Sequence, residues 1–310
     1  MSPPLELGLI GLGRMGANMA RRLSRGGATV HAFDVSPAAR AALGDESRVT
    51  LCDSLSALVQ SLPTRRVLWL MLPAGEISEH TLSALLPLLV PGDLIIDGAN
   101  ANYRDSQRRG AMLATHGLEF MDAGVSGGIW GLREGYALML GGSTAAVASV
   151  KPLVQILAPS PERGWLHCGP IGAGHYVKMV HNGIEYGMMQ AFAEGLALMQ
   201  AKSDLQLDLG AISEMWRHGS VVRSWLLDLI AEFLQKDTQL EHIKPVVADS
   251  GEGRWTAIES IELGVPTPVM TQALMARFAS QGRDDYGAKL LAMMRAGFGG
   301  HAVQSRDGQA

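Results

Sequence analysis

Four polar residues at helical spacing form the pattern in this chain that is best suited to chemistry. Lys178, His181, Asn182 and Glu185 stand at positions i, i+3, i+4 and i+7, so a helix brings them to one face, with Tyr186 beside them at i+8. A lysine partly removed from water gives up its proton more easily and can act as a general base. The glutamate is the candidate acid. The pattern favours a catalytic site for a hydroxylated ligand over a solvated Lys–Glu surface stripe.

A second pattern, Gly11-Leu12-Gly13-Arg14-Met15-Gly16, lies directly between a predicted strand and a predicted helix. Gly11 permits the tight turn, Gly13 lets the backbone approach a pyrophosphate, and Gly16 allows close packing of the helix on the strand. Phosphate groups bind the amides at the positive end of such a helix. An ordinary glycine turn is the alternative in a chain with 37 glycines. The strand–loop–helix context favours a dinucleotide site.

Asp34 ends the next predicted strand and is the expected partner of the cofactor's ribose. A carboxylate at this place accepts hydrogen bonds from the ribose hydroxyls and repels a 2′-phosphate. No arginine follows it directly, and the nearest is Arg40. The sequence therefore predicts NAD as the cofactor, with NADP as a weaker one.

A parallel sheet must position the glycine loop. In the first half, short apolar runs alternate with helical patterns, which is typical of a mostly parallel sheet with helices on both faces. The predicted strands cover 5–10, 29–33, 67–72, 94–97, 120–125 and 136–141, and the predicted helices cover 15–25, 54–61, 77–89 and 103–116.

A helical half must position the polar face. One long helix is predicted over 173–201, because that stretch is helical in pattern and contains no proline. Shorter helices are predicted over 209–217, 224–235, 239–249, 256–263, 266–280 and 285–296, and residues 297–310 are too polar and glycine-rich for a core. The expected fold class is α/β, with a Rossmann-like, doubly wound, mostly parallel sheet in residues 1–170. An all-α C-terminal domain for substrate binding and oligomerisation follows in residues 171–310.

Composition narrows the class of protein. The chain has 310 residues, enough for two domains, and its 47% hydrophobic and 18% charged residues indicate a folded globular protein. A formal net charge of −4 argues against nucleic-acid binding through bulk electrostatics. Cys52 and Cys168 form neither a disulfide framework nor a metal-ligand pattern, so we expect a reducing compartment and no metal site. No signal peptide or long apolar run is visible, and we expect a cytoplasmic protein without a membrane partner.

Taken together, the residues resemble the short form of the decarboxylating 6-phosphogluconate dehydrogenases, within the β-hydroxyacid dehydrogenase superfamily. The resemblance covers nearly the whole chain. General members of the superfamily share the glycine loop and Ser-Gly-Gly, but not the His-Asn-x-x-Glu-Tyr run or the tail. The matching stretches are 11–16, 95–103 with Asp105, Arg108 and Arg109, then 124–128, 172–186, 253–256, 276–277 and the tail 295–301.

The resemblance implies oxidative decarboxylation of 6-phosphogluconate to ribulose 5-phosphate and carbon dioxide, with reduction of NAD. It implies that Lys178 takes the proton of the 3-hydroxyl and later stabilises the enolate oxygen. Glu185 then protonates C-1 of the enediol, and Asn182 and His181 orient the substrate.

The resemblance also implies the binding residues. Tyr186, Arg277, Arg295 and His301 are the candidates for the substrate phosphate, and the tail of one subunit reaches the site of a neighbour, so a homo-oligomer (dimer or tetramer) is implied. The implied cofactor residues are Gly11, Leu12, Gly13, Arg14, Met15, Gly16, Asp34, Leu72, Pro73 and Asn100. The implied substrate residues are Asn100, Ser126, Gly127, Gly128, His181, Asn182, Tyr186, Arg277, Arg295 and His301.

Three departures from the family pattern bear on the substrate. Ala99 stands where the family usually has glycine, Ala101 stands where it often has serine, and the loop 250–255 is shorter and lacks a phosphate-binding lysine. Two alternatives therefore stay open. One is a β-hydroxyacid dehydrogenase without decarboxylation, which acts on a small unphosphorylated acid. The other is an inactive NAD-binding scaffold.

Overall fold

The structure is a computed structural model that describes residues 5–283 and 285–299. The chain divides into two compact units, the first ending at Met179 and the second beginning at Val180. Within the described ranges, no helix combines the length and the apolar character that crossing a membrane requires.

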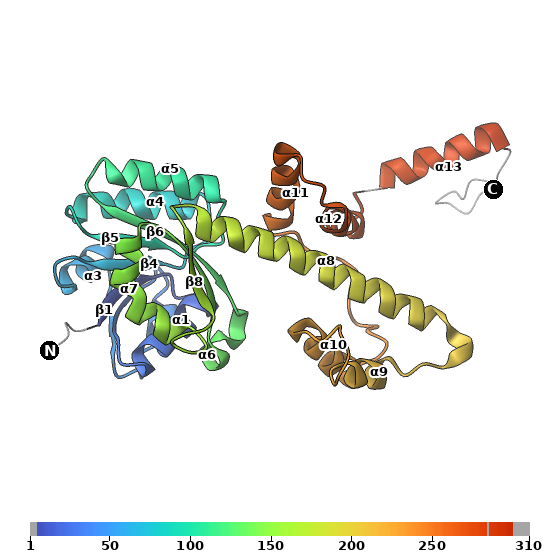
Figure 1. Cartoon of the computed structure of the whole chain (residues 1–310), viewed down its shortest axis with the longest axis horizontal. Coiled ribbons are helices and arrows are strands. Elements are labelled where there is room, and N and C mark those ends of the chain that lie inside the picture. The colour runs from blue at the N-terminus through green and yellow to red at the C-terminus, as the bar shows by residue number, and fades with distance from the viewer. Residues whose placement is uncertain (1–4, 284, 300–310) are drawn as a thin grey trace. The chain divides into compact units, whose positions relative to one another are not determined.

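The first unit is built on one eight-stranded sheet with the strand order β3-β2-β1-β4-β5-β6-β7-β8. The sheet and its helices form the part of Figure 1 drawn in blue to green. Neighbouring strands are parallel except for β6 and β7, which pair antiparallel. The order β3-β2-β1-β4-β5-β6 is that of a doubly wound dinucleotide-binding sheet, so the predicted fold of this half is confirmed. The strands are β1 (Glu6–Ile10), β2 (Thr29–Phe33), β3 (Val49–Leu51), β4 (Val67–Leu70), β5 (Leu94–Asp97), β6 (Glu119–Ser126), β7 (Ala137–Gly141) and β8 (Trp165–Gly169).

Helices cover both faces of the sheet because successive strand residues point to opposite sides. Leu7 and Leu9 belong to a core shared with α1 and α7, whereas Ile10 belongs to a second core shared with α3, α4 and α5. Figure 1 shows α4 and α5 together on one side of the sheet and α1 on the other. The helices are α1 (Arg14–Arg25), α2 (Pro37–Ala41), α3 (Leu55–Ser61), α4 (Glu76–Leu85), α5 (Tyr103–Ala114), α6 (Gly131–Glu134) and α7 (Thr144–Leu157).

The order of the strands also sets where a ligand can bind. The chain winds outward in opposite directions from β1 and β4, and a crevice forms beyond the carboxyl ends of the strands at such a reversal. The loops that follow β1, β4 and β5 therefore meet at one edge of the sheet.

The described part of the second unit is entirely helical, as predicted. Helix α8 is a single helix of 29 residues, and α9 packs on α10 and α11 on α12. Its helices are α8 (Ala173–Ala201), which begins in the first unit, α9 (Leu209–Trp216), α10 (Trp225–Lys236), α11 (Glu252–Leu263), α12 (Pro268–Ser280) and α13 (Asp285–Gly299).

The predicted helix over 239–249 is wrong, since this segment is irregular. The Asp237 carboxylate accepts hydrogen bonds from the amides of Gln239 and Leu240, and Leu240 takes a positive φ of 52°. Such local side-chain bonds compete with a helix, and Pro245 lacks the amide that a helix interior needs. Helix α11 also begins four residues before the predicted start, directly after Gly251. The sequence patterns did not predict α2, α6, α7, β3 or β8, and α7 contains Pro152.

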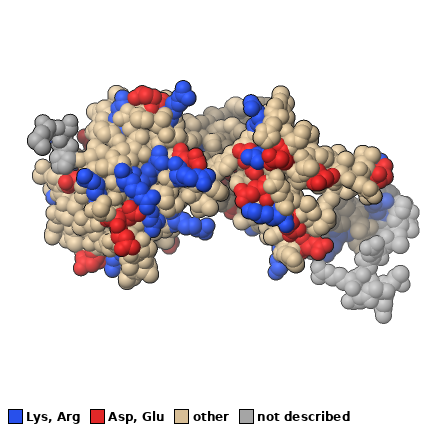
Figure 2. Space-filling model, turned by 90° about the horizontal axis from the view of Figure 1, so that it is seen from below, with Lys and Arg blue, Asp and Glu red and all other residues tan. Residues whose placement is uncertain are grey.

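Charged side chains of both signs are mixed over the face drawn in Figure 2. In the first unit a group of basic side chains lies beside a group of acidic ones. This mixture is consistent with the small formal charge of the chain.

Candidate active site

The glycine loop after β1 has the backbone form that a dinucleotide requires. Gly11 has a φ of +94°, and a Cβ there would lie 2.4 Å from the carbonyl oxygen of Met71. A Cβ on Gly16 would lie 1.9 Å from the carbonyl oxygen of Gly11. At Gly13 the space is open, with no described atom within 4 Å of a Cβ, and no described side chain caps the start of α1. The loop therefore packs tightly at its base and leaves the helix start accessible to a phosphate group.

Asp34 is fixed by the backbone on both sides of its carboxylate. The amide of Leu12 donates to Oδ2 at 2.7 Å, and the amide of Ser36 donates to Oδ1 at 2.8 Å. Each oxygen keeps a second lone pair for a ligand hydroxyl. Arg40 donates from Nη1 to the Asp34 carbonyl at 2.6 Å, so a cation lies beside Asp34, a contact that the spacing in sequence did not predict.

A cavity of about 380 Å³ lies at the carboxyl edge of the sheet, within the first unit. The glycine loop, the loops after β4 and β5, strand β6 and helix α8 each contribute to its wall. It thus brings seven of the predicted cofactor residues together with the predicted catalytic lysine. The lining residues are Gly13, Arg14, Met15, Gly16, Met71, Leu72, Pro73, Gly98, Ala99, Asn100, Val125 and Lys178.

Strand β6 anchors the beginning of α8 and with it Lys178. The fully buried Asp122 carboxylate accepts hydrogen bonds from the amides of Gly172 at 2.6 Å and His175 at 2.7 Å. A Cβ on Gly124 would lie 2.5 Å from Cβ of Lys178, so the lysine stem packs directly on the strand. Sequence reasoning missed Asp122, although a carboxylate within an apolar strand is a signal that it has a partner.

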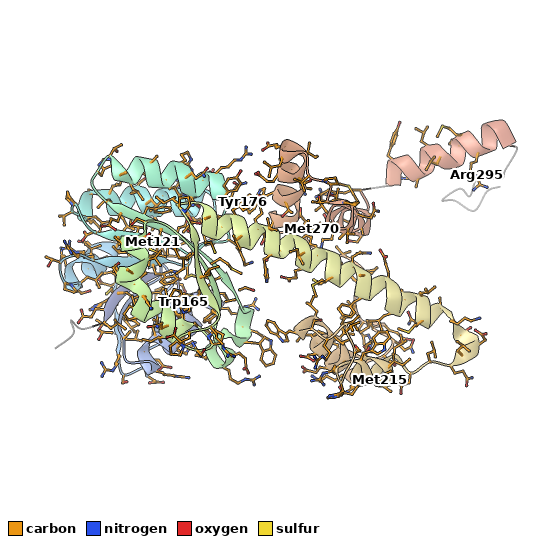
Figure 3. All side chains as sticks on the ribbon, in the orientation of Figure 1. Met121, Trp165, Tyr176, Met215, Met270 and Arg295 are labelled. Atoms are coloured by element: carbon orange, nitrogen blue, oxygen red, sulfur yellow. The ribbon has the colours of Figure 1, made fainter. Side chains whose placement is uncertain are left out.

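Side chains of α5 also contact the first turns of α8. Tyr176, labelled in Figure 3, meets Tyr103 edge to face, with ring centroids 5.1 Å apart. The buried Ser106 hydroxyl lies 2.7 Å from Nδ1 of His175. Both contacts restrict the position of the helix that carries Lys178.

Further along α8, in the second unit, the polar residues form a hydrogen-bonded cluster. Asn182, only 9% exposed, donates from Nδ2 to Oε1 of the buried Glu252 at 2.8 Å. His181 Nδ1 lies 3.0 Å from Asn182 Oδ1 and 3.9 Å from Glu185 Oε2. Sequence reasoning missed Glu252, and its signal was a glutamate at the first position of a helix behind a glycine.

Two of the four predicted phosphate residues lie together. The Arg277 guanidinium lies over the Tyr186 ring, 3.5 Å from its centroid, and donates to the Ala248 carbonyl at 2.8 Å. Arg277 is therefore not the solvated surface residue that a lone arginine late in a helix often is. Arg295 is an exposed side chain on α13 (Figure 3), and His301 lies outside the described residues.

The predicted substrate loop follows the end of β6. Ser126 is the last residue of the strand, and Gly127 and Gly128 have φ values of +131° and +51°, which favour glycine. A Cβ on Gly131 would lie 1.9 Å from the Tyr136 ring, and burial raises the pKa of Tyr136 to about 12. The segment that follows β6 therefore packs against the ring of Tyr136, which is buried and neutral.

Across 5–283 and 285–299, no group of three or more His, Cys, Asp or Glu side chains could hold a metal ion. Burial is the main reason that the pKa of the Cys168 thiol is raised above its usual value, and the same holds for Cys52. Both thiols are thus less acidic than ordinary ones, which disfavours reactive-cysteine chemistry.

Comparison with known proteins covers both units. The NAD binding domain of 6-phosphogluconate dehydrogenase matches residues 6–169, and the C-terminal domain of 6-phosphogluconate dehydrogenase matches residues 174–289. A Haloferax volcanii protein named 6-phosphogluconate dehydrogenase, NAD(+)-dependent, decarboxylating, is 40% identical over 304 residues, which is 98% of this chain and 100% of that one.

Solved structures show the same fold. The Plasmodium falciparum 6-phosphogluconate dehydrogenase aligns with a TM-score of 0.82 and 30% identity, over 98% of this chain and 67% of that one. A Mycobacterium tuberculosis 3-hydroxyisobutyrate dehydrogenase aligns with a TM-score of 0.69 and 22% identity, over 91% and 94% of the two chains. The second likeness shows the fold alone.

The first unit is thus an NAD-binding domain. The relative from Haloferax volcanii matches 98% of this chain, so the similarity extends over both units. With both halves matched and a full-length relative at 40% identity, the chain belongs to the 6-phosphogluconate dehydrogenase family of oxidoreductases.

Proposed function

We propose that the protein oxidises and decarboxylates 6-phosphogluconate to ribulose 5-phosphate and carbon dioxide, with NAD as the preferred acceptor and NADP as a weaker one. The observation that carries this proposal is the cavity that Lys178 shares with the glycine loop and Asn100. The NAD(+)-dependent, decarboxylating relative supports it.

The first unit fits a dinucleotide. The open space at Gly13 suits a phosphate group, and the fixed Asp34 carboxylate suits ribose hydroxyls. Leu72, Pro73 and Asn100 line the same cavity. When bound, NAD supplies the hydride acceptor of the reaction.

In this proposal Lys178 is the general base and later a cation. It removes the proton of the 3-hydroxyl as that carbon loses a hydride, which leaves a β-keto acid. The bond between the carboxyl group and C-2 then breaks, and its electron pair moves onto the carbonyl oxygen as carbon dioxide leaves. Lys178, now protonated, stabilises that oxygen electrostatically.

Glu185 is the proposed acid that protonates the enediol, at the carbon which becomes C-1 of ribulose 5-phosphate. Asn182 and His181 orient the substrate, and Ser126, Gly127 and Gly128 contact its carboxylate. The bond from Asn182 to Glu252 supports the first of these roles, because it fixes which way the Asn182 amide points.

The proposed phosphate site contains Tyr186, Arg277, Arg295 and His301. An arginine fork suits a phosphate dianion, and the stacking of Arg277 on Tyr186 supports the pairing of these two residues. We further propose a homo-oligomer in which the C-terminal tail of one subunit completes the site of another.

The test is an assay of the purified protein with 6-phosphogluconate, comparing NAD with NADP and trapping carbon dioxide. Reduction of NAD with an equal amount of carbon dioxide supports the full proposal. Turnover of a short unphosphorylated hydroxyacid alone would establish the non-decarboxylating alternative. Dinucleotide binding without turnover of either substrate would leave the inactive scaffold as the remaining alternative.

A further inference from the structure

Arg109 on α5 is a buried arginine that the proposed reaction does not use. Its side chain has 0% exposure. Nη1 lies 2.6 Å from Oδ2 of Asp97, and Nε donates to Oε1 of Glu79 at 3.0 Å. Removing a guanidinium from water costs free energy that is recovered only with good partners, and an apolar replacement is often as stable. The stability of the fold alone therefore explains poorly why Arg109 is buried between Asp97 and Glu79.

The first partner leads to the cofactor cavity. Asp97 is the last residue of β5 and is 1% exposed. Its second oxygen, Oδ1, accepts a hydrogen bond from the amide of Ala99 at 3.0 Å. Ala99 and Asn100 line the cavity, so one carboxylate joins Arg109 to the turn that carries Asn100.

This turn has little room to adjust. A Cβ on Gly98 would lie 2.5 Å from Nε1 of Trp69 and 2.6 Å from Sδ of Met71. A change at Asp97 therefore cannot be absorbed by a local shift of Gly98 toward the sheet.

The second partner leads to another part of the wall of the same cavity. Glu79 lies on α4, directly after the loop that contains Leu72 and Pro73. The neighbouring Ser78 donates from its hydroxyl to the Pro73 carbonyl at 2.9 Å. Arg109 thus connects, through Glu79 and Asp97, the two loops that follow β4 and β5.

We propose that Arg109 is a positioning residue that holds these two loops in the form that binds the dinucleotide. Arg109 does not line the cavity itself, so it acts through Asp97 and Glu79. The part assigned to Asn100 rests on the proposed function, whereas dinucleotide binding rests on the family.

The test compares Arg109→Lys with Arg108→Lys. Lysine keeps the charge but lacks the fork that reaches two carboxylates. Arg108 also binds Glu79, but its side chain is 56% exposed. Its second described partner is Asp105 and not Asp97, so Arg108→Lys serves as the control. We expect Arg109→Lys to weaken the Kd for NAD about tenfold, measured by calorimetry well below its unfolding temperature, because residues in one hydrogen-bonded network are coupled. Arg108→Lys should stay within about twofold of the unaltered protein.

A double-mutant cycle separates positioning from general stability. If Arg109 acts through the loop of Asn100, Arg109→Lys should change the Kd for NAD much less when Asn100→Ala is already present. Full tenfold losses in both backgrounds would overturn the proposal, and so would an unchanged Kd with a lowered unfolding temperature.

A second variant tests the same link if Arg109→Lys is unstable. If Arg109→Lys does not fold, Glu79→Ala removes both acceptor oxygens at the more exposed end of the link, and an unchanged Kd in that variant would also overturn the proposal. Because binding of NAD needs no turnover, the result stands apart from the assay with 6-phosphogluconate. If the protein binds NAD but does not oxidise 6-phosphogluconate, the proposed function is refuted. The Kd for NAD of Arg109→Lys still tests the role of Arg109 in that case.

Discussion

At the scale of single residues, Lys178 carries most of the proposed chemistry. It lines the cavity with the glycine loop, yet the contacts that shape that loop and fix Asp34 come from the backbone. Base catalysis and dinucleotide binding should therefore separate on substitution.

Lys178→Met should lower turnover of 6-phosphogluconate by about a thousandfold, the scale of a lost general base. The Kd for NAD should change little. Steady-state kinetics and calorimetry measure the two quantities. Lys151→Met is a matched control, since Lys151 is a lysine of the same unit that lies 5.7 Å from the centre of the Trp165 ring. Normal turnover in Lys178→Met would disprove the base assignment.

Glu252 belongs to the same scale, because one bond links it to Asn182. Glu252→Gln keeps an oxygen that can accept from the Asn182 amide, whereas Glu252→Ala leaves that amide without this partner at a cost of about 1–3 kcal/mol. We expect kcat to fall at least about tenfold more in the alanine variant than in the glutamine variant. Equal kcat values in two folded variants would show that Glu252 does not position Asn182.

At the scale of elements, the packing of α8 on β6 decides where Lys178 lies. Asp122 binds the first amides of the helix, and Gly124 leaves room for the lysine stem. The helix pattern alone predicts which residues share a face, but the contact with a strand fifty residues earlier determines that Lys178 enters the cavity wall.

Gly124→Ala should therefore misplace Lys178 while the fold survives. The added methyl group meets the lysine Cβ at 2.5 Å and the Gly174 carbonyl at 2.9 Å, and displacements of about 1 Å can cost about a hundredfold in rate. A fall of kcat between about tenfold and a hundredfold is expected. Gly195→Ala is the control, because it adds the same group to α8 where no described atom lies within 4 Å.

The link between α4 and α5 gives a pH dependence. Hydrogen bonding to Arg108 is the main reason that the pKa of Glu79 lies below its usual value. Burial acts in the opposite direction and raises this pKa, and hydrogen bonding to Arg109 lowers it further. A lowered pKa stabilises the fold above the unfolded-state pKa, and this stabilisation is lost as the pH falls through the folded-state pKa. The unfolding temperature of Glu79→Gln should thus lie below that of the unaltered protein at neutral pH and approach it below about pH 4. Since Glu79 is 35% exposed, the two proteins should differ in their free energy of unfolding by less than about 1 kcal/mol. A difference in unfolding temperature that stays constant across pH would show that the charge of Glu79 does not stabilise the fold.

At the scale of the whole molecule, helices α8 and α13 expose many large apolar side chains. Extended exposed apolar patches often mark contacts with other chains, which supports the proposed homo-oligomer. The exposed large apolar residues of α8 and α13 are Val177, Ile184, Met188, Met189, Leu198, Tyr286, Leu290, Leu291, Met293 and Met294.

Subunit complementation tests whether the tail serves a neighbouring site. Lys178→Met and His301→Ala should each be nearly inactive. When the two variants are mixed under conditions that exchange subunits, activity should return, because some sites then combine an intact Lys178 with an intact tail from the other chain. Light scattering gives the oligomeric state. A mixture that exchanges subunits but stays inactive would show that His301 does not complete a neighbouring site.

Much of this protein was determined by its sequence alone. Alternating apolar runs predicted the parallel sheet, a proline-free helical pattern predicted α8 over its full length, and the glycine loop predicted the dinucleotide site, because each depends on local spacing. Local spacing misled at 239–249, where side chains bond to the backbone. Tertiary structure decided the rest: Arg40 beside Asp34, Glu252 on Asn182, and the buried Arg109 between Asp97 and Glu79. No periodicity of the sequence records these contacts, because each depends on where the folded backbone places one side chain. Arg40 reaches back to the end of β2, and Glu252 meets Asn182 between two helices of the second unit. Arg109 meets Asp97 and Glu79 because the strand order places the segments after β4 and β5 side by side.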